Sequence, residues 1–187
     1  FLFIHLPKNA GSSVTKVLAD YIGVDREDLR PQKHKFISSR EVPSVLNGKQ
    51  DDYFIFTVIR NPWERTVSYF HYLQQIRQPP NNLSKDVKFA NWVRAGGFRT
   101  LQTQMSQLSD DFPCSVSRNI DYVARLENLS EDWPKICKKM GISCDMMHDK
   151  KSKHKHYSEY YNEVTKDIVY KFYKDDVQCL GYEFEKK

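Results

Sequence analysis

Four short runs of apolar and β-branched residues along the chain predict the strands of a sheet. The clearest run covers residues 53–59 and reads YFIFTVI, without polar alternation. A run of this kind is typical of a strand that is buried on both faces of a parallel sheet. Residues 1–4 and 120–124 predict two further strands, and residues 179–184 predict a short strand at the end of the chain.

Between these runs the apolar positions recur at the spacing of a helix. The predicted helices cover residues 14–22, 62–73, 85–95, 99–108, 130–140 and 158–174. The helix over residues 130–140 has acidic residues in its first turn and lysines in its last, the order that the helix dipole favours. We expect Ser130 to cap the start of this helix and Gly141 to end it.

The order of these elements predicts the fold class. Strands alternate with helices, no internal repeat is visible, and no linker divides the chain. We therefore expect an α/β fold, a three-layer P-loop-like sandwich around a central and mainly parallel sheet, in one domain over residues 1–187. Ligands bind at the carboxyl ends of the strands in such sheets. The loops at residues 7–13 and 60–62 each follow a predicted strand and should share that edge.

Composition narrows the class of partner. The chain has 187 residues, of which 29 are basic and 24 acidic, for a net charge of +5. This mild excess suits an anionic ligand but is too small to indicate nucleic acid, so we expect no nucleic-acid partner. No run approaches the roughly 20 apolar residues of a membrane span. The first residues already have strand character, so we expect that further residues precede them.

The cysteines and the glycosylation patterns leave the compartment open. Cys114, Cys137, Cys144 and Cys179 show no C-x-x-C pair and no zinc spacing, so no metal site is predicted. Cys137 lies on a predicted helix and Cys144 just beyond it, which allows a disulfide without indicating one. The sequons at Asn82 and Asn128 are of a kind too common by chance to decide a compartment. The oligomeric state is equally open.

The loop at residues 7–13 carries the first candidate chemistry. A strand, a tight loop and a helix in this order direct backbone N–H groups and the positive end of a helix at one point. Gly11 allows close backbone approach to a ligand, Lys8 adds a charge, and Ser12 and Ser13 add hydroxyl donors. The loop differs from the G-x-x-x-x-G-K-[ST] loop, because its lysine precedes its only glycine. An ordinary turn with a serine N-cap is the alternative.

The second candidate segment begins at Arg60-Asn61-Pro62, at the end of the clearest strand. Arg60 offers a planar, fork-shaped donor that suits a phosphate. Ser68 lies about two helical turns further on and reaches the same ligand only if the chain folds back at Pro62. We expect Arg65 to be structural.

Together these segments resemble the sulfotransferases that use 3′-phosphoadenosine 5′-phosphosulfate (PAPS), and most closely the carbohydrate branch that includes the uronyl 2-O-sulfotransferases. Residues 5–13 are similar to that family's 5′-phosphosulfate loop, H-x-P-K-T-x-G-T/S-S. Residues 60–68 are similar to its 3′-phosphate segment, R-[ND]-P-x-x-R-x-x-S. Residues 125–129 and 180–184 also match, so the resemblance spans nearly the whole chain.

The resemblance implies a P-loop-like fold, no metal, and a role for each matched residue. Lys8 would bridge toward the leaving phosphate oxygen, and Arg60 and Ser68 would hold the 3′-phosphate. The basic segment 150–156 stands where relatives carry a mobile loop over the nucleotide; a solvated loop is the alternative. The expected cofactor-binding residues are Pro7, Lys8, Asn9, Ala10, Gly11, Ser12, Ser13, Arg60, Ser68, Lys153 and His156. Asn9 replaces the usual threonine and can still donate, so we expect a changed contact there.

Sulfuryl transfer needs in-line positioning, neutralisation of the leaving group's charge, and a base for the acceptor hydroxyl. His34 lies between the two motifs, where similar enzymes carry a base histidine, and is the first candidate. His5 is the second, with a hydrogen-bonded core histidine as its alternative. Glu64 and Glu127 are carboxylate alternatives. The predicted catalytic residues are therefore His34, Lys8 and His5.

The predicted enzyme moves a sulfuryl group from PAPS to an acceptor hydroxyl, with a carbohydrate as the expected acceptor. One alternative is a P-loop-like nucleotide kinase, which would need a differently placed lysine and magnesium ligands. The other is a non-catalytic module that binds polyanions or a nucleotide. We expect acceptor contacts from residues 25–52 and 77–118. The compartment would be the cytoplasm in a microbe and the Golgi lumen in an animal.

Overall fold

The computed structural model describes residues 1–25, 37–76, 83–84, 86–110, 114–143 and 155–186. The chain forms two compact units. The first consists of residues 1–60 and 107–151, and the second of residues 61–106 and 152–187. The single domain over residues 1–187 stays a prediction.

A parallel sheet is the centre of the first unit. Its strands are β1 (Leu2–Ile4), β2 (Ile55–Ile59) and β3 (Tyr122–Arg125), in the order β1-β2-β3. Leu2 pairs with Ile55, and Phe56 pairs with Tyr122. Every residue of β2 is buried, as its unbroken apolar pattern predicts. The predicted α/β class with a parallel sheet is confirmed.

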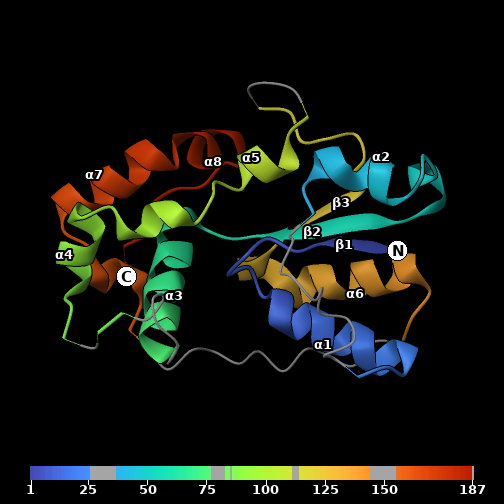
Figure 1. Cartoon of the computed structure of the whole chain (residues 1–187), viewed down its shortest axis with the longest axis horizontal. Helices are drawn as coiled ribbons and strands as arrows, with labels where there is room; N and C mark the ends of the chain where they lie inside the picture. Colours follow the sequence, from blue (N-terminus) through green and yellow to red (C-terminus); the bar gives the residue numbers. More distant parts are fainter. Residues whose placement is uncertain (26–36, 77–82, 85, 111–113, 144–154, 187) are drawn as a thin grey trace. The chain divides into compact units, whose positions relative to one another are not determined.

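Helices cover both faces of this sheet. α1 (Gly11–Ile22) and α6 (Leu129–Met140) lie on one face and the short α2 (Val42–Val45) on the other (Figure 1). The short 3-10 helices of this unit are η1 (Ser39–Glu41), η2 (Gln50–Asp52) and η4 (Leu126–Asn128). The core between the sheet and α1 and α6 consists of apolar residues: Val14, Leu18, Phe56, Val58, Ala124, Trp133 and Ile136.

The start of α6 differs from the prediction. The helix begins at Leu129 with Asn128 at its N-cap, so Ser130 lies inside the first turn and the predicted cap was wrong. Asp132 explains why this end is fixed: its carboxylate accepts from the Tyr122 hydroxyl at 2.8 Å and from the backbone N–H of Arg125 at 3.2 Å. These bonds tie the helix to β3. Gly141 ends the helix in the left-handed conformation, as predicted.

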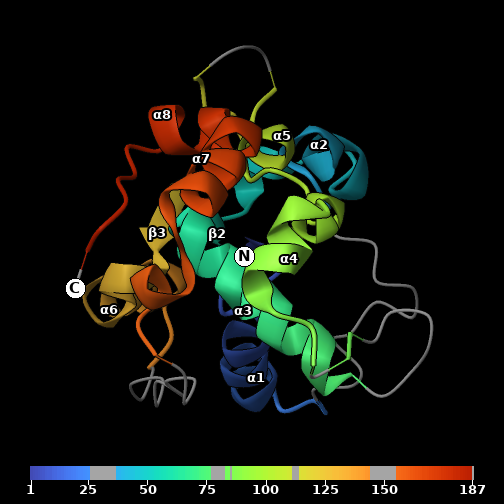
Figure 2. The same ribbon diagram turned by 90° about the vertical axis from the view of Figure 1, so that its left-hand side faces the viewer.

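Helices make up the second unit. Its elements are α3 (Pro62–Gln75), α4 (Phe89–Arg94), α7 (Glu163–Phe172) and α8 (Lys174–Cys179), with the 3-10 helices η3 (Gly97–Thr100) and η5 (Tyr157–Tyr160). α3, α4 and α7 pack against one another (Figures 1 and 2). α5 (Met105–Leu108) lies where the chain passes from this unit to the first.

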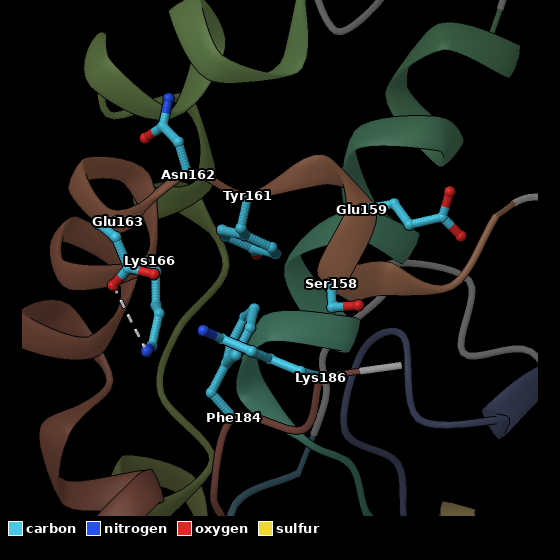
Figure 3. Close-up of a pocket in the computed structure, with 8 residues that line it drawn as sticks. All are labelled: Ser158, Glu159, Tyr161, Asn162, Glu163, Lys166, Phe184 and Lys186. Atoms are coloured by element: carbon cyan, nitrogen blue, oxygen red, sulfur yellow. Dashed lines mark ion pairs between the residues drawn. The ribbon is translucent and has the colours of Figure 1, made fainter.

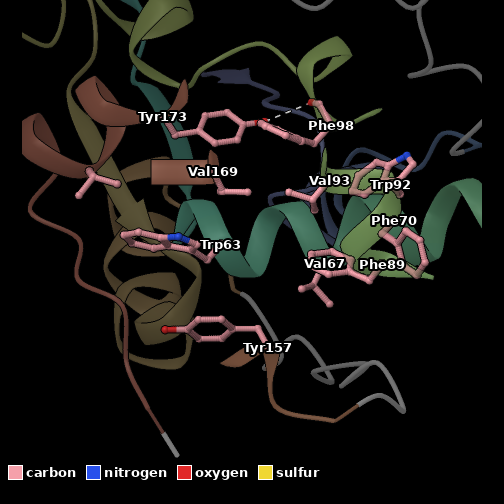
Figure 4. Packing of buried hydrophobic residues seen from close by; sticks show 11 residues of the cluster. Trp63, Val67, Phe70, Phe89, Trp92, Val93, Phe98, Tyr157, Val169 and Tyr173 are labelled. Carbon is pink, nitrogen blue, oxygen red and sulfur yellow. Dashed lines mark hydrogen bonds between the residues drawn. The ribbon is translucent and has the colours of Figure 1, made fainter. Parts of the chain in front are cut away.

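Aromatic rings fill the core of the second unit (Figure 4). The rings of Phe70 and Phe89 meet edge to face at 5.3 Å and 89°, and those of Phe98 and Phe172 do so at 5.3 Å and 89°. Edge-to-face contacts of this kind add about 0.5–1.5 kcal/mol each to the burial of the rings. Tyr173 is completely buried, and its hydroxyl donates to the Leu101 carbonyl at 2.9 Å.

The last third of the chain corrects two predictions. The helix predicted over residues 158–174 is interrupted: η5 ends at Tyr160, and Asn162 starts α7 with a capping box, because its side chain accepts from the Thr165 N–H at 2.9 Å. The strand predicted over residues 179–184 does not form. The chain instead turns at Gly181, which has a φ of 64°, and the Tyr182 N–H returns to the Val177 carbonyl.

The cysteines differ from the open expectation. Cys114, Cys137 and Cys179 each take part in a disulfide bond, and no cysteine is free among the residues that the structure describes. Cys144 lies outside those residues. The sequence allowed a disulfide but offered no spacing that indicates one.

Candidate functional site

The loop between β1 and α1 has an unusual backbone. Lys8 has a φ of 72° and Ala10 a φ of 57°, both in the left-handed region that favours glycine. Each such residue costs on the order of 1–3 kcal/mol and persists only where its surroundings hold it. The Asn9 N–H donates to the Leu6 carbonyl at 3.3 Å and closes the turn between them. This strained loop is therefore held in place by specific contacts.

Asn9 provides one of these contacts. Its side chain is completely buried, and its amide nitrogen donates to the Val58 carbonyl on β2 at 2.8 Å. The bond fastens the loop to the central strand. The sequence predicted an Asn9 contact to a cofactor; the structure shows this donor directed at the protein, and the cofactor contact stays a prediction.

Gly11 accommodates His5. A Cβ atom on Gly11 would lie 1.7 Å from Nε2 of His5, so no larger residue fits beside this ring. The imidazole also stacks on the Phe3 ring, with centroids 5.6 Å apart and planes 17° apart. The glycine, which the sequence suggested for close approach to a ligand, here allows close approach of a histidine. His5 is thereby placed at the first turn of α1.

The N-terminus of α1 begins at Gly11 with Ala10 at its N-cap and no side-chain cap. Ser12 and Ser13 lie inside the first turn, so the alternative of an ordinary serine N-cap was wrong. The first N–H groups of a helix have no partner within it, and they carry the positive end of its dipole. This end of α1 therefore favours an anion.

Arg60 connects the end of β2 to this loop. Its side chain is only 8% exposed, and its Nη1 donates to the Lys8 carbonyl at 3.1 Å. Burial and, secondarily, the positive charge of Arg60 lower the pKa of Lys8 from 10.5 to about 8. Two cationic side chains thus converge beside the N-terminus of α1.

The other residues of the Arg60 segment have structural roles. Asn61 caps α3, because its side-chain oxygen accepts from the N–H groups of Trp63 at 3.1 Å and Glu64 at 3.4 Å. Its amide nitrogen donates to the Glu183 carbonyl at 2.9 Å. Arg65 is 1% exposed and donates to the Gln102 carbonyl at 2.8 Å, which agrees with the structural role expected of it.

The remaining predicted residues lie elsewhere. Ser68 is half-buried on α3, and His156 caps η5 by accepting from the Ser158 N–H with Nδ1; both belong to the second unit. His34 and Lys153 lie outside the described residues. Glu64 and Glu127, the carboxylate alternatives, are half-buried on α3 and exposed in η4. The structure brings together Lys8, Asn9, Gly11, Arg60 and His5.

Residues 1–183 match a family model described as the sulfotransferase family. The chain belongs to the sulfotransferase family. An uncharacterized protein of Archaeoglobus fulgidus is 28% identical to this sulfotransferase over 92 residues, which are 49% of this chain and 71% of that protein.

A solved structure supports the fold. The crystal structure of mouse sulfotransferase SULT7A1 complexed with PAP matches with a TM-score of 0.55 at 14% identity, and covers 95% of this chain and 83% of that one. At this identity the match concerns the fold alone, and it confirms the predicted P-loop-like α/β architecture. The family match confirms the predicted sulfotransferase and favours it over the nucleotide kinase. The carbohydrate branch stays a prediction.

Sequence reasoning missed the contacts that hold the loop at residues 7–13 of this sulfotransferase. The bonds from Asn9 to Val58 and from Arg60 to Lys8 join positions far apart in the sequence. The asparagine in place of the family's threonine was a signal for the first. Nothing in the sequence indicated the second, because Lys8 adopts a conformation that usually marks glycine.

The second unit of the sulfotransferase contains a pocket of about 230 Å³ (Figure 3). Tyr161 and Phe184 supply aromatic walls, and Glu163, Lys166 and Lys186 supply charges. The ammonium of Lys166 lies 4.9 Å from the Phe184 ring centre and 3.7 Å from the Glu163 carboxylate. The volume is below the roughly 300–1,000 Å³ that encloses a drug-sized ligand, so the pocket suits a single ring.

Within the described ranges, no three His, Cys, Asp or Glu side chains are grouped so that they could hold a metal ion. In the same part of the chain, no helix has the length and hydrophobicity needed to cross a membrane.

Proposed function

We propose that this sulfotransferase transfers a sulfuryl group from PAPS to an acceptor hydroxyl, with the donor's phosphates bound between the loop at residues 7–13 and Arg60. The observation that carries the proposal is the direct bond between Arg60 and Lys8 beside the N-terminus of α1. The buried Arg60 and the half-buried Lys8 repel each other, and an anion that binds both removes that repulsion. A ligand with several phosphate charges fits this requirement.

Lys8 would neutralise the leaving group. During transfer the bond between sulfur and the bridging phosphate oxygen breaks, and a bond from sulfur to the acceptor oxygen forms. The acceptor's proton passes to a base, and negative charge gathers on the oxygen that leaves. An ammonium held at that oxygen stabilises the transition state more than the ground state. The first turn of α1 would hold the adjacent phosphate through its N–H groups.

His34 remains our first proposal for the base and His5 the second. His5 is supported by its position, since its ring is fixed against Gly11 at the first turn of α1 and stacks on Phe3. Ser68, Lys153 and His156 remain proposed donor-binding residues on the strength of the motif resemblance.

We propose a carbohydrate acceptor on the strength of the motif resemblance, with contacts from residues 25–52 and 77–118, and we add the pocket of the second unit, which lies outside both ranges, as a candidate subsite for a sugar ring. Phe184 is clamped edge to face by Trp63 at 5.4 Å and by Tyr161 at 5.6 Å, so it presents a rigid apolar wall. The Lys166 ammonium already lies 4.9 Å from the centre of this ring, so a sugar would place its C–H groups on the remaining part of the ring and its hydroxyls on Lys186 and Glu163. Phe184→Ala and Lys186→Ala should raise the KM for the acceptor and leave PAP binding unchanged; unaltered KM values would remove the pocket from the proposal.

The disulfide-bonded cysteines support an oxidising compartment, because such bonds persist in secretory lumens and are rare in the cytosol. Between the two compartments considered above, we propose the lumenal one. Mass spectrometry of the protein from its own cells, alkylated without reduction, tests this: free thiols at Cys114, Cys137 and Cys179 would contradict it.

Calorimetric binding of adenosine 3′,5′-bisphosphate (PAP) in the presence of a chelator tests the donor site. We expect the intact chain to bind PAP much more tightly than adenosine 5′-monophosphate, and Arg60→Ala to remove that preference. The exposed Arg118→Ala serves as the matched control and should retain it. Equal binding of both nucleotides, or of neither, would contradict the proposed site.

A further inference from the structure

A hydrogen bond within the protein joins the two segments proposed to bind the donor's phosphates, the loop at residues 7–13 and the segment that begins at Arg60. Arg60, at the end of β2, donates one N–H to the carbonyl of Lys8, in the loop after β1. A guanidinium has five N–H donors, and this bond uses one of them. Lys8 needs an external restraint because its backbone is left-handed, and Arg60 is buried enough to supply a fixed one.

We propose that Arg60 is a positioning residue for Lys8: it fixes the strained backbone of Lys8 and couples the charge of the Lys8 ammonium to anion binding at the guanidinium. The inference rests on the proposed donor site but assigns a new relation between two of its residues. Arg60 would act on Lys8 whether or not a nucleotide is present.

The groups near Lys8 decide how its charge responds to a bound anion. Arg60 faces it from β2 and is the charged side chain that lowers its pKa, after the larger effect of burial. The first turn of α1 contains no acidic residue and contributes the hydroxyls of Ser12 and Ser13. His5, which precedes Lys8 in the chain, packs on Gly11 and Phe3. Burial is the largest cause of the lowered pKa of Lys8, and the charge of Arg60 is the second.

The coupling has a definite sign. With a pKa of about 8, roughly half of the Lys8 side chains are neutral at pH 8 and about a tenth are neutral at pH 7. A phosphate on Arg60 offsets the charge that lowers this pKa, so the pKa rises and Lys8 takes up a proton. Lys8 is then fully charged when the donor is bound, which is when the leaving group needs it.

The first test needs no nucleotide, so it is separate from a failure of the proposed function. Lysines of the intact chain are labelled by ¹³C reductive methylation and titrated by NMR, with Lys8→Arg identifying the Lys8 resonance. We expect Lys8 to titrate near pH 8, and Arg60→Gln to raise its proton affinity roughly threefold to tenfold. Arg118→Gln removes an exposed charge and should leave the titration unchanged. Arg60→Lys keeps the positive charge, so the pKa of Lys8 should stay almost as low as in the intact chain.

An unchanged Lys8 titration in a folded Arg60→Gln protein would overturn the inference. Should that variant fail to fold, the intact protein decides by calorimetry of PAP binding in buffers of different ionisation heat. The expected uptake is about half a proton at pH 8 and much less at pH 7, because about half of the Lys8 side chains are neutral at pH 8 and about a tenth at pH 7. The nucleotide's phosphates, with a pKa near 6, are already ionised at pH 8 and do not contribute to this uptake. No uptake at pH 8 would also overturn it. A shifted Lys8 without PAP binding would instead reject the donor site alone.

Discussion

Two buried arginines five positions apart serve two different regions of the molecule. Arg60, in the first unit, bonds to a strained loop and lies close enough to a second cation to lower its pKa. Arg65, in the second unit, donates to the Gln102 carbonyl. Burial raises the pKa of Asp176, and the N–H groups of Gln104 and Met105 and, after them, the charge of Arg65 oppose this rise. One arginine meets a like charge and the other an opposite one. The like charge beside Arg60 favours binding of an anion there, whereas Arg65 contributes to holding a chain segment in place.

The surroundings differ in the same way. Asp176 is completely buried and accepts from the N–H groups of Gln104 at 2.8 Å and Met105 at 2.7 Å. With Arg65 it fixes the segment at residues 102–105 to the aromatic core. Beside Lys8, the buried side chains of Asn9 and Arg60 instead attach the loop before α1 to β2 and its end.

The largest effect is expected from Arg65→Met. This change removes the donor to the Gln102 carbonyl and one of the charges that oppose the burial of Asp176, which together should lower the free energy of unfolding by about 3 kcal/mol or more. Arg60→Met should cost less, because it also removes the repulsion with Lys8. Urea unfolding of both variants measures the difference, with Arg118→Met as an exposed control expected within about 0.5 kcal/mol of the parent. Equal losses of unfolding free energy in Arg60→Met and Arg65→Met would contradict the different roles given to the two arginines.

The pH dependence of stability tests Lys8. Its folded pKa of about 8 lies below the unfolded 10.5, so the unfolded chain binds more protons between these values and stability rises with pH there. Between pH 7 and pH 10 the free energy of unfolding of the intact protein should rise by about 1–3 kcal/mol more than that of Lys8→Met. This range is reduced to allow for solvent screening of the half-buried Lys8. Denaturant titrations at both pH values measure it; parallel curves for the two proteins would contradict the lowered pKa.

Gly11→Ala probes the packing of His5. The added methyl group would collide with the imidazole and should destabilise the protein by about 1–3 kcal/mol. Combined with His5→Ala, which empties the space, it should cost much less than the sum of the two single changes. A thermal-unfolding double-mutant cycle measures this coupling, and simple additivity would show that the two residues do not constrain each other.

The sequence was sufficient to predict those helices and strands whose signals lie within a few neighbouring residues. The unbroken apolar run predicted the buried strand β2, and the charges around residues 130–140 predicted a helix that ends at Gly141. The motif resemblance predicted Lys8 and Arg60 for one site; the structure places them in contact, and their role in binding the donor stays a prediction. Periodicity also located α7, although it missed the capping box at Asn162 that separates this helix from η5.

The rest depends on contacts between distant positions. The left-handed backbone of Lys8 is stabilised from β2, and the requirement for Gly11 comes from the ring of His5. The predicted terminal strand failed for a similar reason: residues 179–184 are apolar enough for a strand, but their backbone bonds return to α8 at Val177. Single-sequence patterns carry none of these pairings.

The central claim, sulfuryl transfer from PAPS with Lys8 at the leaving group, is tested most directly by a transfer assay. The protein is incubated with ³⁵S-labelled PAPS and a panel of carbohydrate acceptors in a chelator, beside Lys8→Met and the exposed-lysine control Lys138→Met. The account predicts a labelled glycan from the intact chain and the control, and a rate about 10²–10³ lower for Lys8→Met in a folded protein. A Lys8→Met protein that transfers sulfate at the full rate would contradict it.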